Sequence, residues 1–263
     1  MVLLSRESLS IAIAAAGMLA QTGFGSGEFQ YGPISEAGTV CATAVVQLTI
    51  NGVIDEETLC VPISNGSGFA AANAALDYDD GTCRFRMSST ATLTTAYVLT
   101  TDPGQLGIGG ESLAVHTVWT RGDSGVCQPP SVCTSADASA DAESDLLIDV
   151  NFTLEQDTRI KVAICGLSRN VAEGSSTFEW RLFHEGSQIE KCLLNVNGIG
   201  EDAGPVYTFN APKGDYLWQV VYSTQGLSVI ASVTGCPESD SDSLTGGDAW
   251  AATLSIVKVG VGP

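Results

Sequence analysis

Positively charged side chains are scarce in this sequence. Its 263 residues include 11 Lys and Arg against 30 Asp and Glu, which gives a formal net charge of −19 at pH 7. Such a surface repels the phosphates of nucleic acids and of anionic lipids, so neither is expected as a partner. Histidine is rarer still, with His116 and His184 alone. This scarcity disfavours most general acid–base and zinc chemistry.

Long apolar runs are also missing. The longest, residues 9–20, is too short to span a bilayer as a helix. It follows a single positive side chain, Arg6, and precedes the small and polar residues 21–23. This pattern is typical of a cleavable signal segment, which we assign to residues 1–25. We therefore expect an exported protein, secreted or at the cell surface, with no membrane span in its mature form.

Cysteine is present in an even number, and no two cysteines are spaced as C-x-x-C. The eight are Cys41, Cys60, Cys83, Cys127, Cys133, Cys165, Cys192 and Cys236. Because no histidine cluster accompanies them, disulfides are expected rather than a zinc site. The connectivity stays open, although Cys127 and Cys133 flank a short loop that they could close.

Alternation of apolar and polar residues predicts β-strands throughout the chain. Residues 41–50 alternate in this way, and Asn51-Gly52 after them predicts a hairpin turn. In residues 158–165, Ile160, Val162 and Ile164 are expected to share one face. Residues 178–182 and 216–222 carry aromatic or aliphatic residues at every second position. The sequence therefore predicts an all-β protein.

Two segments interrupt this pattern. Residues 126–144 are rich in Pro, Ser, Ala and acidic residues, and are expected to be a linker. The linker would separate an N-terminal β-rich domain, residues 35–125, from a C-terminal β-sandwich, residues 145–260. Residues 237–248, rich in Ser and Asp, are expected to be a flexible loop. The fold class predicted is two β-sandwich or jelly-roll-like domains after the signal segment.

Several short motifs of the second half are those of exported bacterial modules. They are Asn151-Phe-Thr-Leu154, Thr158-Arg-Ile-Lys-Val162, Trp180-Arg-Leu-Phe183 with the glycine turn of residues 185–189, and Phe209-Asn-Ala-Pro-Lys-Gly-Asp-Tyr216. In these motifs the segment 145–259 resembles the secreted β-sandwich modules typified by pre-peptidase C-terminal domains. It departs from them in its three cysteines and in Lys213, where alanine is usual. The resemblance implies a structural or binding accessory outside the cell, without catalytic residues.

Two acidic clusters are candidates for calcium, the one cofactor that the residues suggest. Alternate aspartates in a turn supply the oxygen ligands that this ion prefers. The alternative is a solvated acidic loop that prevents edge-to-edge association of sheets. The candidate ligands are Asp77, Asp79, Asp80, Asp240, Asp242 and Asp248.

Two further motifs overlap at residues 121–125. Gly122-Asp-Ser-Gly125 resembles the nucleophile segment of trypsin-like proteases, but His116 lies too close to Ser124 to be the distant base of such a triad. Arg121-Gly-Asp123 is an adhesion tripeptide if exposed, and a solvated turn otherwise. We expect no catalytic residue here.

The four tryptophans have two interpretations. They could form a platform for sugar rings, or they could belong to the core, which we expect for three of them. The four are Trp119, Trp180, Trp218 and Trp250. A carboxylate pair for glycoside hydrolysis cannot be named among thirty acids.

These observations together favour a secreted, non-catalytic structural or interaction protein. It would be a component of an extracellular surface, matrix or filament that assembles through β-strand edges. Its expected partners are other copies of itself, matrix or cell-surface components, and glycans. The alternative is a carbohydrate- or calcium-binding lectin-like module, and a hydrolase is the third candidate.

Overall fold

Every regular element of this chain is a β-strand. The computed structural model describes residues 28–49, 52–79, 84–123, 135–234 and 237–257. Its strands are β1 (Gln30–Leu48), β2 (Val53–Pro62), β3 (Ser67–Asp79), β4 (Arg84–Asp102), β5 (Gln105–Gly122), β6 (Ala136–Leu154), β7 (Thr158–Arg169), β8 (Ser175–His184), β9 (Ser187–Asn197), β10 (Gly200–Ala203), β11 (Tyr207–Ala211), β12 (Gly214–Val233) and β13 (Glu238–Val257). The all-β prediction is confirmed.

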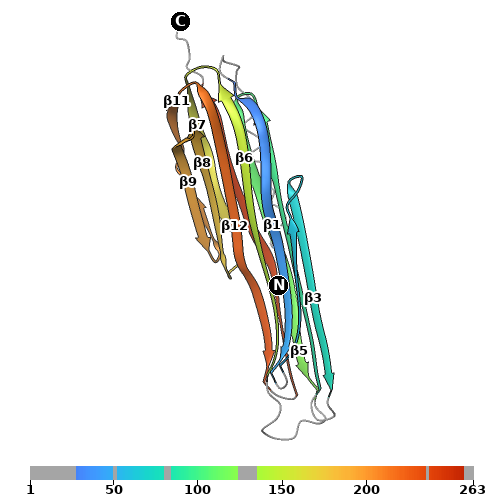
Figure 1. Ribbon diagram of the computed structural model, residues 1–263. Helices are drawn as coiled ribbons and strands as arrows, with labels where there is room; N and C mark the ends of the chain where they lie inside the picture. Colours follow the sequence, from blue (N-terminus) through green and yellow to red (C-terminus); the bar gives the residue numbers. More distant parts are fainter. Residues whose placement is uncertain (1–27, 50–51, 80–83, 124–134, 235–236, 258–263) are drawn as a thin grey trace.

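The strands form two antiparallel sheets packed face to face as a sandwich (Figure 1). One sheet, which we call sheet A, has the order β2-β1-β6-β12-β8-β9. The other, sheet B, has the order β10-β7-β13-β5-β4-β3, and β11 also pairs with β7. β12 and β13 are each 20 residues long, about 65 Å at the rise of a β-strand, which explains the slender body.

The sheets are not divided as the sequence predicted. Sheet A pairs β1 with β6, and sheet B pairs β5 with β13, so both sheets mix strands of the two expected domains. The prediction of a linker is wrong for residues 136–144, which open the strand β6 between β1 and β12. Alternate alanines of β6 face the core while the acidic residues between them face outward. Residues 126–134 lie outside the described chain, as does the expected signal segment.

The acidic segment 237–248 is also a strand rather than a loop. β13 begins at Glu238 and pairs with β5 from the register Glu238↔Gly122 onward. Its first six residues are exposed on both faces, so no apolar period marks them in the sequence. Backbone hydrogen bonds to β5 hold this part of the strand.

The expected core faces are largely confirmed. Trp180, Trp218 and Trp250 are fully buried, as expected for three of the four tryptophans. The ring of Trp250 stacks on Phe178 and Tyr222, with centroids 5.3 and 5.1 Å apart. Alternation also holds for residues 216–222, whose aromatic members are all buried.

One predicted face changes sides at a β-bulge. Ile160 and Val162 are buried as expected, but Ile164 is not, and Cys165 is buried in its place. The pairing of β7 with β13 gains one residue on β7 at this point. A bulge of this kind reverses which residues of a strand face the core.

A polar cluster lies between the two sheets. Arg169 Nη1 is 3.0 Å from Asp248 Oδ1, and both side chains are fully buried. Ser176 Oγ and Tyr222 Oη donate to Asp248 Oδ2 at 2.5 and 2.8 Å. Burial, together with the nearby Asp248 carboxylate, raises the pKa of Tyr222 well above its usual value. The cluster pairs a buried positive charge with a buried negative charge, and its members come from strands of both sheets.

Candidate functional site

The first candidate calcium cluster contains arginines as well as aspartates. Asp77 and Asp79 lie on β3 rather than in a turn. Arg84 Nη2 is 3.5 Å from Asp77 Oδ2, and Arg86 Nε is 3.6 Å from the same oxygen. The carboxylates are therefore already partly neutralised. Asp80 lies outside the described residues, and calcium binding here stays a prediction.

The second candidate cluster is split by the fold. Asp240 Oδ2 accepts a hydrogen bond from the backbone N–H of Ser232, and Asp242 Oδ1 accepts one from Ser243 N. Asp248 points instead into the core, where it pairs with Arg169. Among the described residues, no three His, Cys, Asp or Glu side chains gather as a metal site.

The charges of the Arg121-Gly-Asp123 tripeptide pair with each other. Arg121 Nε lies 2.7 Å from Asp123 Oδ1. Arg84 and Arg86 also approach Asp123 Oδ2, at 4.0 and 3.9 Å. The tripeptide thus belongs to an ion-pair cluster with Arg84 and Arg86 at the end of β5. Ser124 of the protease-like motif lies outside the described residues.

Two disulfides confirm the interpretation of the cysteines. Cys41–Cys60 joins neighbouring strands β1 and β2 within sheet A. Cys165–Cys192 joins β7 of sheet B to β9 of sheet A. Both are compatible with an extracellular protein. Cys83, Cys127, Cys133 and Cys236 lie outside the described residues.

The two histidines lie in different surroundings. The ring of His184 packs in a tilted arrangement against the ring of Tyr216, with centroids 4.7 Å apart. His116 is fully buried on β5, and its Nδ1 accepts the backbone N–H of Thr92 at 3.3 Å. Burial lowers the pKa of His116 below its ordinary value.

His116 is therefore expected to make stability depend on pH. Below about pH 6.5 the imidazole of His116 is protonated in the unfolded chain but stays neutral in the folded chain. The free energy of unfolding therefore falls as pH falls, by up to about 1.4 kcal/mol per pH unit. His116→Phe should flatten this slope, measured by urea unfolding at several pH values between 7 and 5. His184→Gln is the comparison variant, because it removes the other histidine side chain. An unchanged slope in His116→Phe would contradict the assignment.

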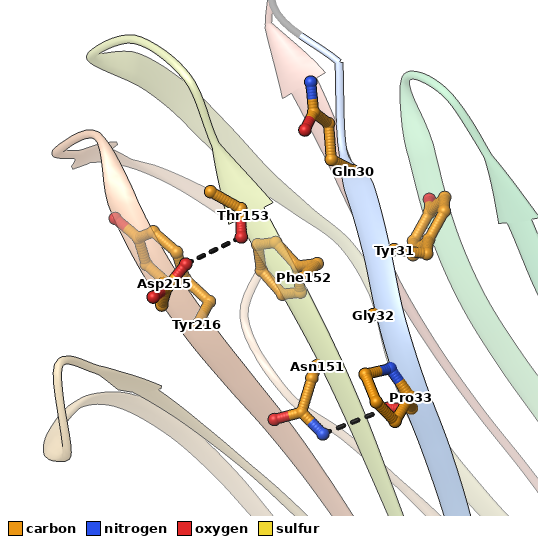
Figure 2. Close-up of a pocket in the computed structure, with 9 residues that line it drawn as sticks. All are labelled: Gln30, Tyr31, Gly32, Pro33, Asn151, Phe152, Thr153, Asp215 and Tyr216. Carbon is orange, nitrogen blue, oxygen red and sulfur yellow. Dashed lines mark hydrogen bonds between the residues drawn. The ribbon is translucent and has the colours of Figure 1, made fainter.

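A shallow polar hollow of about 550 Å³ lies on sheet A, where β1, β6 and β12 run side by side (Figure 2). Thr153 Oγ1 donates to Asp215 Oδ1 at 2.7 Å, and Asn151 Nδ2 donates to the carbonyl of Pro33 at 3.0 Å. Gly32 lies beside Asn151, where a Cβ atom would come within 3.3 Å of that side chain. The hollow offers the amides of Gln30 and Asn151 and the carboxylate of Asp215, which suit hydrogen bonds to a polar ligand. A pair of carboxylates for acid–base work is not among its nine lining residues.

The outer edge of β2 offers a second kind of site, made of backbone groups. The Cα atoms of Cys41 and Cys60 are 4.1 Å apart, the spacing of a non-hydrogen-bonded antiparallel pair. Ile63, of the opposite parity, donates its N–H to the Gly38 carbonyl next door. Even-numbered residues of β2 therefore direct their N–H and C=O groups away from β1. These residues are Ile54, Glu56, Thr58 and Cys60. Within the described chain, β2 pairs with β1 alone.

Carboxylates of this chain cap the exposed edges of β3, β9 and β12. Asp55 and Glu57 of β2 point inward and accept the edge amides of Ala75 and Asn73 on β3, at 3.0 and 2.6 Å. Asp240 does the same for β12, as described above. On β9 the backbone N–H of Asn195 donates to Asp202 Oδ2 at 3.1 Å. A carboxylate that accepts an edge amide occupies that amide, and so blocks the addition of a strand at the capped position. β2 thus shields the edge of β3 while its own edge faces outward.

Comparison with known proteins adds little. No protein-family model matches the chain, and no curated protein does. A chain of the T13 IBDV viral particle aligns with 10% sequence identity, covering 94% of this chain and 83% of that chain. The TM-score is 0.17, which is too low to indicate a shared fold. The resemblance to pre-peptidase C-terminal modules stays a prediction.

Proposed function

We propose that this chain is an exported, non-catalytic structural or interaction protein of an extracellular surface, matrix or filament. It joins other copies, or matrix and cell-surface proteins, by adding a strand to the outer edge of β2. The observation that carries the proposal is the row of outward backbone groups at Ile54, Glu56, Thr58 and Cys60. Strand addition supplies affinity through main-chain hydrogen bonds, and so requires such a row.

Charge regulates this edge. β2 carries Asp55, Glu56 and Glu57 in sequence, on a chain of net charge −19. Mutual repulsion keeps free copies apart at low ionic strength, and salt, cations or a basic partner strand weaken it. Assembly is therefore expected to increase with ionic strength.

Glu56→Pro is expected to abolish this assembly, because proline removes an outward N–H while leaving the bonds to β1 intact. Glu56→Ala is the matched control, since it removes the same charge and keeps the N–H. Mass photometry and negative-stain microscopy of the mature protein, with and without calcium or added salt, measure the assembly. Glu56→Ala should assemble at least as well as the parent chain, and Glu56→Pro should form no fibres and no oligomers larger than a dimer. Equal assembly of the two variants would contradict the proposal.

A lectin-like module is the second candidate, and the polar hollow beside Asn151 and Asp215 favours it. Those side chains are of the kinds that hydrogen-bond sugar hydroxyls. Trp119, 41% exposed on sheet B, is a separate surface that could stack on a sugar ring. Binding on a glycan array without any assembly would favour this candidate over strand addition.

A further inference from the structure

Over four consecutive rows, the outer face of sheet B carries no charged side chain on β3, β4, β5 and β13. Positions that face outward on β3, β4, β5 and β13 lie in register in four rows. The rows are Phe69, Thr94, Leu113 and Gly247; Ala71, Thr92, Val115 and Thr245; Asn73, Thr90, Thr117 and Ser243; and Ala75, Ser88, Trp119 and Ser241. We call these sixteen residues the neutral face. Because the chain has a net charge of −19, an area of sixteen residues without a charged side chain differs clearly from the rest of its surface.

Four large apolar side chains of the neutral face are exposed. Phe69 is 56% exposed, Leu113 43%, Val115 40% and Trp119 41%. Serine and threonine surround them on β4 and β13, so the face is flat and offers hydroxyl groups between apolar groups. Exposed apolar side chains gathered on one face are typical of interaction surfaces.

The outer face of sheet A has the opposite character. Along β6, the outward positions are mostly carboxylates, namely Asp137, Asp141, Glu143, Asp145 and Asp149. Partial burial, and then the negative charge of Glu143, raises the pKa of Asp141. Two copies would repel each other strongly through sheet A. Sheet B is the face on which they can approach without bringing like charges together.

The two ends of the neutral face carry opposite charges on the same strand. Glu111 lies one row beyond Leu113, and Arg121 lies one row beyond Trp119. A two-fold axis perpendicular to the strands, passing at position 116 of β5, would place Glu111 of one copy over Arg121 of the other. The same operation would place Leu113 over Trp119, and Val115 over Thr117. The face is therefore complementary to itself in an antiparallel arrangement.

We propose that two copies of this chain pack neutral face against neutral face, with β5 crossing β5 in the antiparallel sense. Four strands and the six rows from Glu111 to Arg121 span about 19 Å by about 34 Å. Two such faces would bury about 1,300 Å², within the range of specific protein interfaces. The nearly aligned packing of two sheets gives a close contact of this kind. This dimer is independent of the β2 edge, which lies in the other sheet.

The test is sedimentation velocity of the mature protein over a range of concentrations. The parent chain is expected to dimerise, and Val115→Glu should raise the dimer Kd more than a hundredfold by burying like charges near the axis. Ile230→Glu is the matched control, because it adds the same charge on the outer face of sheet A, where Ile230 is 62% exposed. It should leave the Kd within about threefold.

A charge exchange tests the arrangement without changing the centre of the face. Glu111→Arg and Arg121→Glu should each weaken the dimer about tenfold, and the double variant should recover most of the loss. Glu56→Pro should leave the dimer unchanged, which separates this proposal from assembly through β2. A parent chain that stays monomeric at all concentrations would overturn the dimer, and retention of that monomer on an insoluble polysaccharide would identify a flat neutral polymer as the occupant. Equal effects of Val115→Glu and Ile230→Glu would overturn it as well.

Discussion

Replacing Arg169 with methionine is expected to lower the free energy of unfolding at pH 7 by about 3–5 kcal/mol. The substitution keeps an apolar chain of similar length but leaves the Asp248 carboxylate buried without its cation. Arg169 Nη1 also contacts Ser176 Oγ at 2.6 Å and Thr224 Oγ1 at 3.0 Å, so two hydroxyls would lose a partner. Urea unfolding of the oxidised protein, followed by tryptophan fluorescence, measures the loss.

The double variant Arg169→Met with Asp248→Leu is the control for this prediction. Removing both charges leaves no unpaired ion, so it should recover a large part of the stability lost in the single variant. If Arg169→Met alone costs less than about 1 kcal/mol, then the pair does not hold the two sheets together. A double variant that is less stable than the single one would indicate that packing, rather than charge, dominates at this site.

The strands that the sequence predicted best are those with large apolar residues at every second position. Trp180 marks its face clearly, because this buried ring lies between Glu179 and Arg181. The first half of β6, residues 136–144, was missed because Ala138 and Ala140 provide the buried side of its alternation, and a methyl group gives a weak contrast with aspartate and serine. The same composition is typical of linkers, so local pattern alone favoured the wrong assignment.

The position of the candidate site was also beyond local pattern. The hairpin of β1 and β2 follows from Asn51-Gly52 and the flanking alternation, and the register Leu48↔Val53 confirms it. β2 lies at the edge of sheet A because β1 has β2 on one side and β6 on the other. The pairing of β1 with β6 joins residues about a hundred positions apart in the sequence. The neutral face likewise exists because β13 pairs with β5, a contact that no local rule predicts. Its residues are scattered over four strands and share no motif.

Gly174→Ala is expected to destabilise the protein by about 2–5 kcal/mol. This is more than the same substitution should cost at the other described glycines of positive φ. Gly174 has φ of 78°, and a Cβ atom there would lie 2.1 Å from the carbonyl oxygen of Gln225 and 2.4 Å from that of Gly226. Both oxygens belong to backbone, so the clash can be relieved only by moving β12. The backbone strain contributes about 1–2 kcal/mol and the overpacking about 1–3 kcal/mol.

Gly186→Ala separates these two contributions. Gly186 has φ of 79°, almost the value at Gly174, but a Cβ atom there would meet nothing within 4 Å. It should therefore cost only the strain, about 1–2 kcal/mol, in the same urea experiment. Equal losses in the two variants would show that the close approach to β12 contributes nothing.

The contact at Gly174 matters because it fixes where the sandwich changes width. β12 gains one residue between Thr224 and Leu227, at the point where its neighbour β8 begins. Beyond this bulge, residues 227–233 of β12 have β6 on one side and no strand of sheet A on the other. Gly174 lets the chain enter β8 against the bulge, and so marks the end of the part of sheet A in which β8 pairs with β12. A variant that moves this point would lengthen or shorten the edge of β12 that Asp240 now caps.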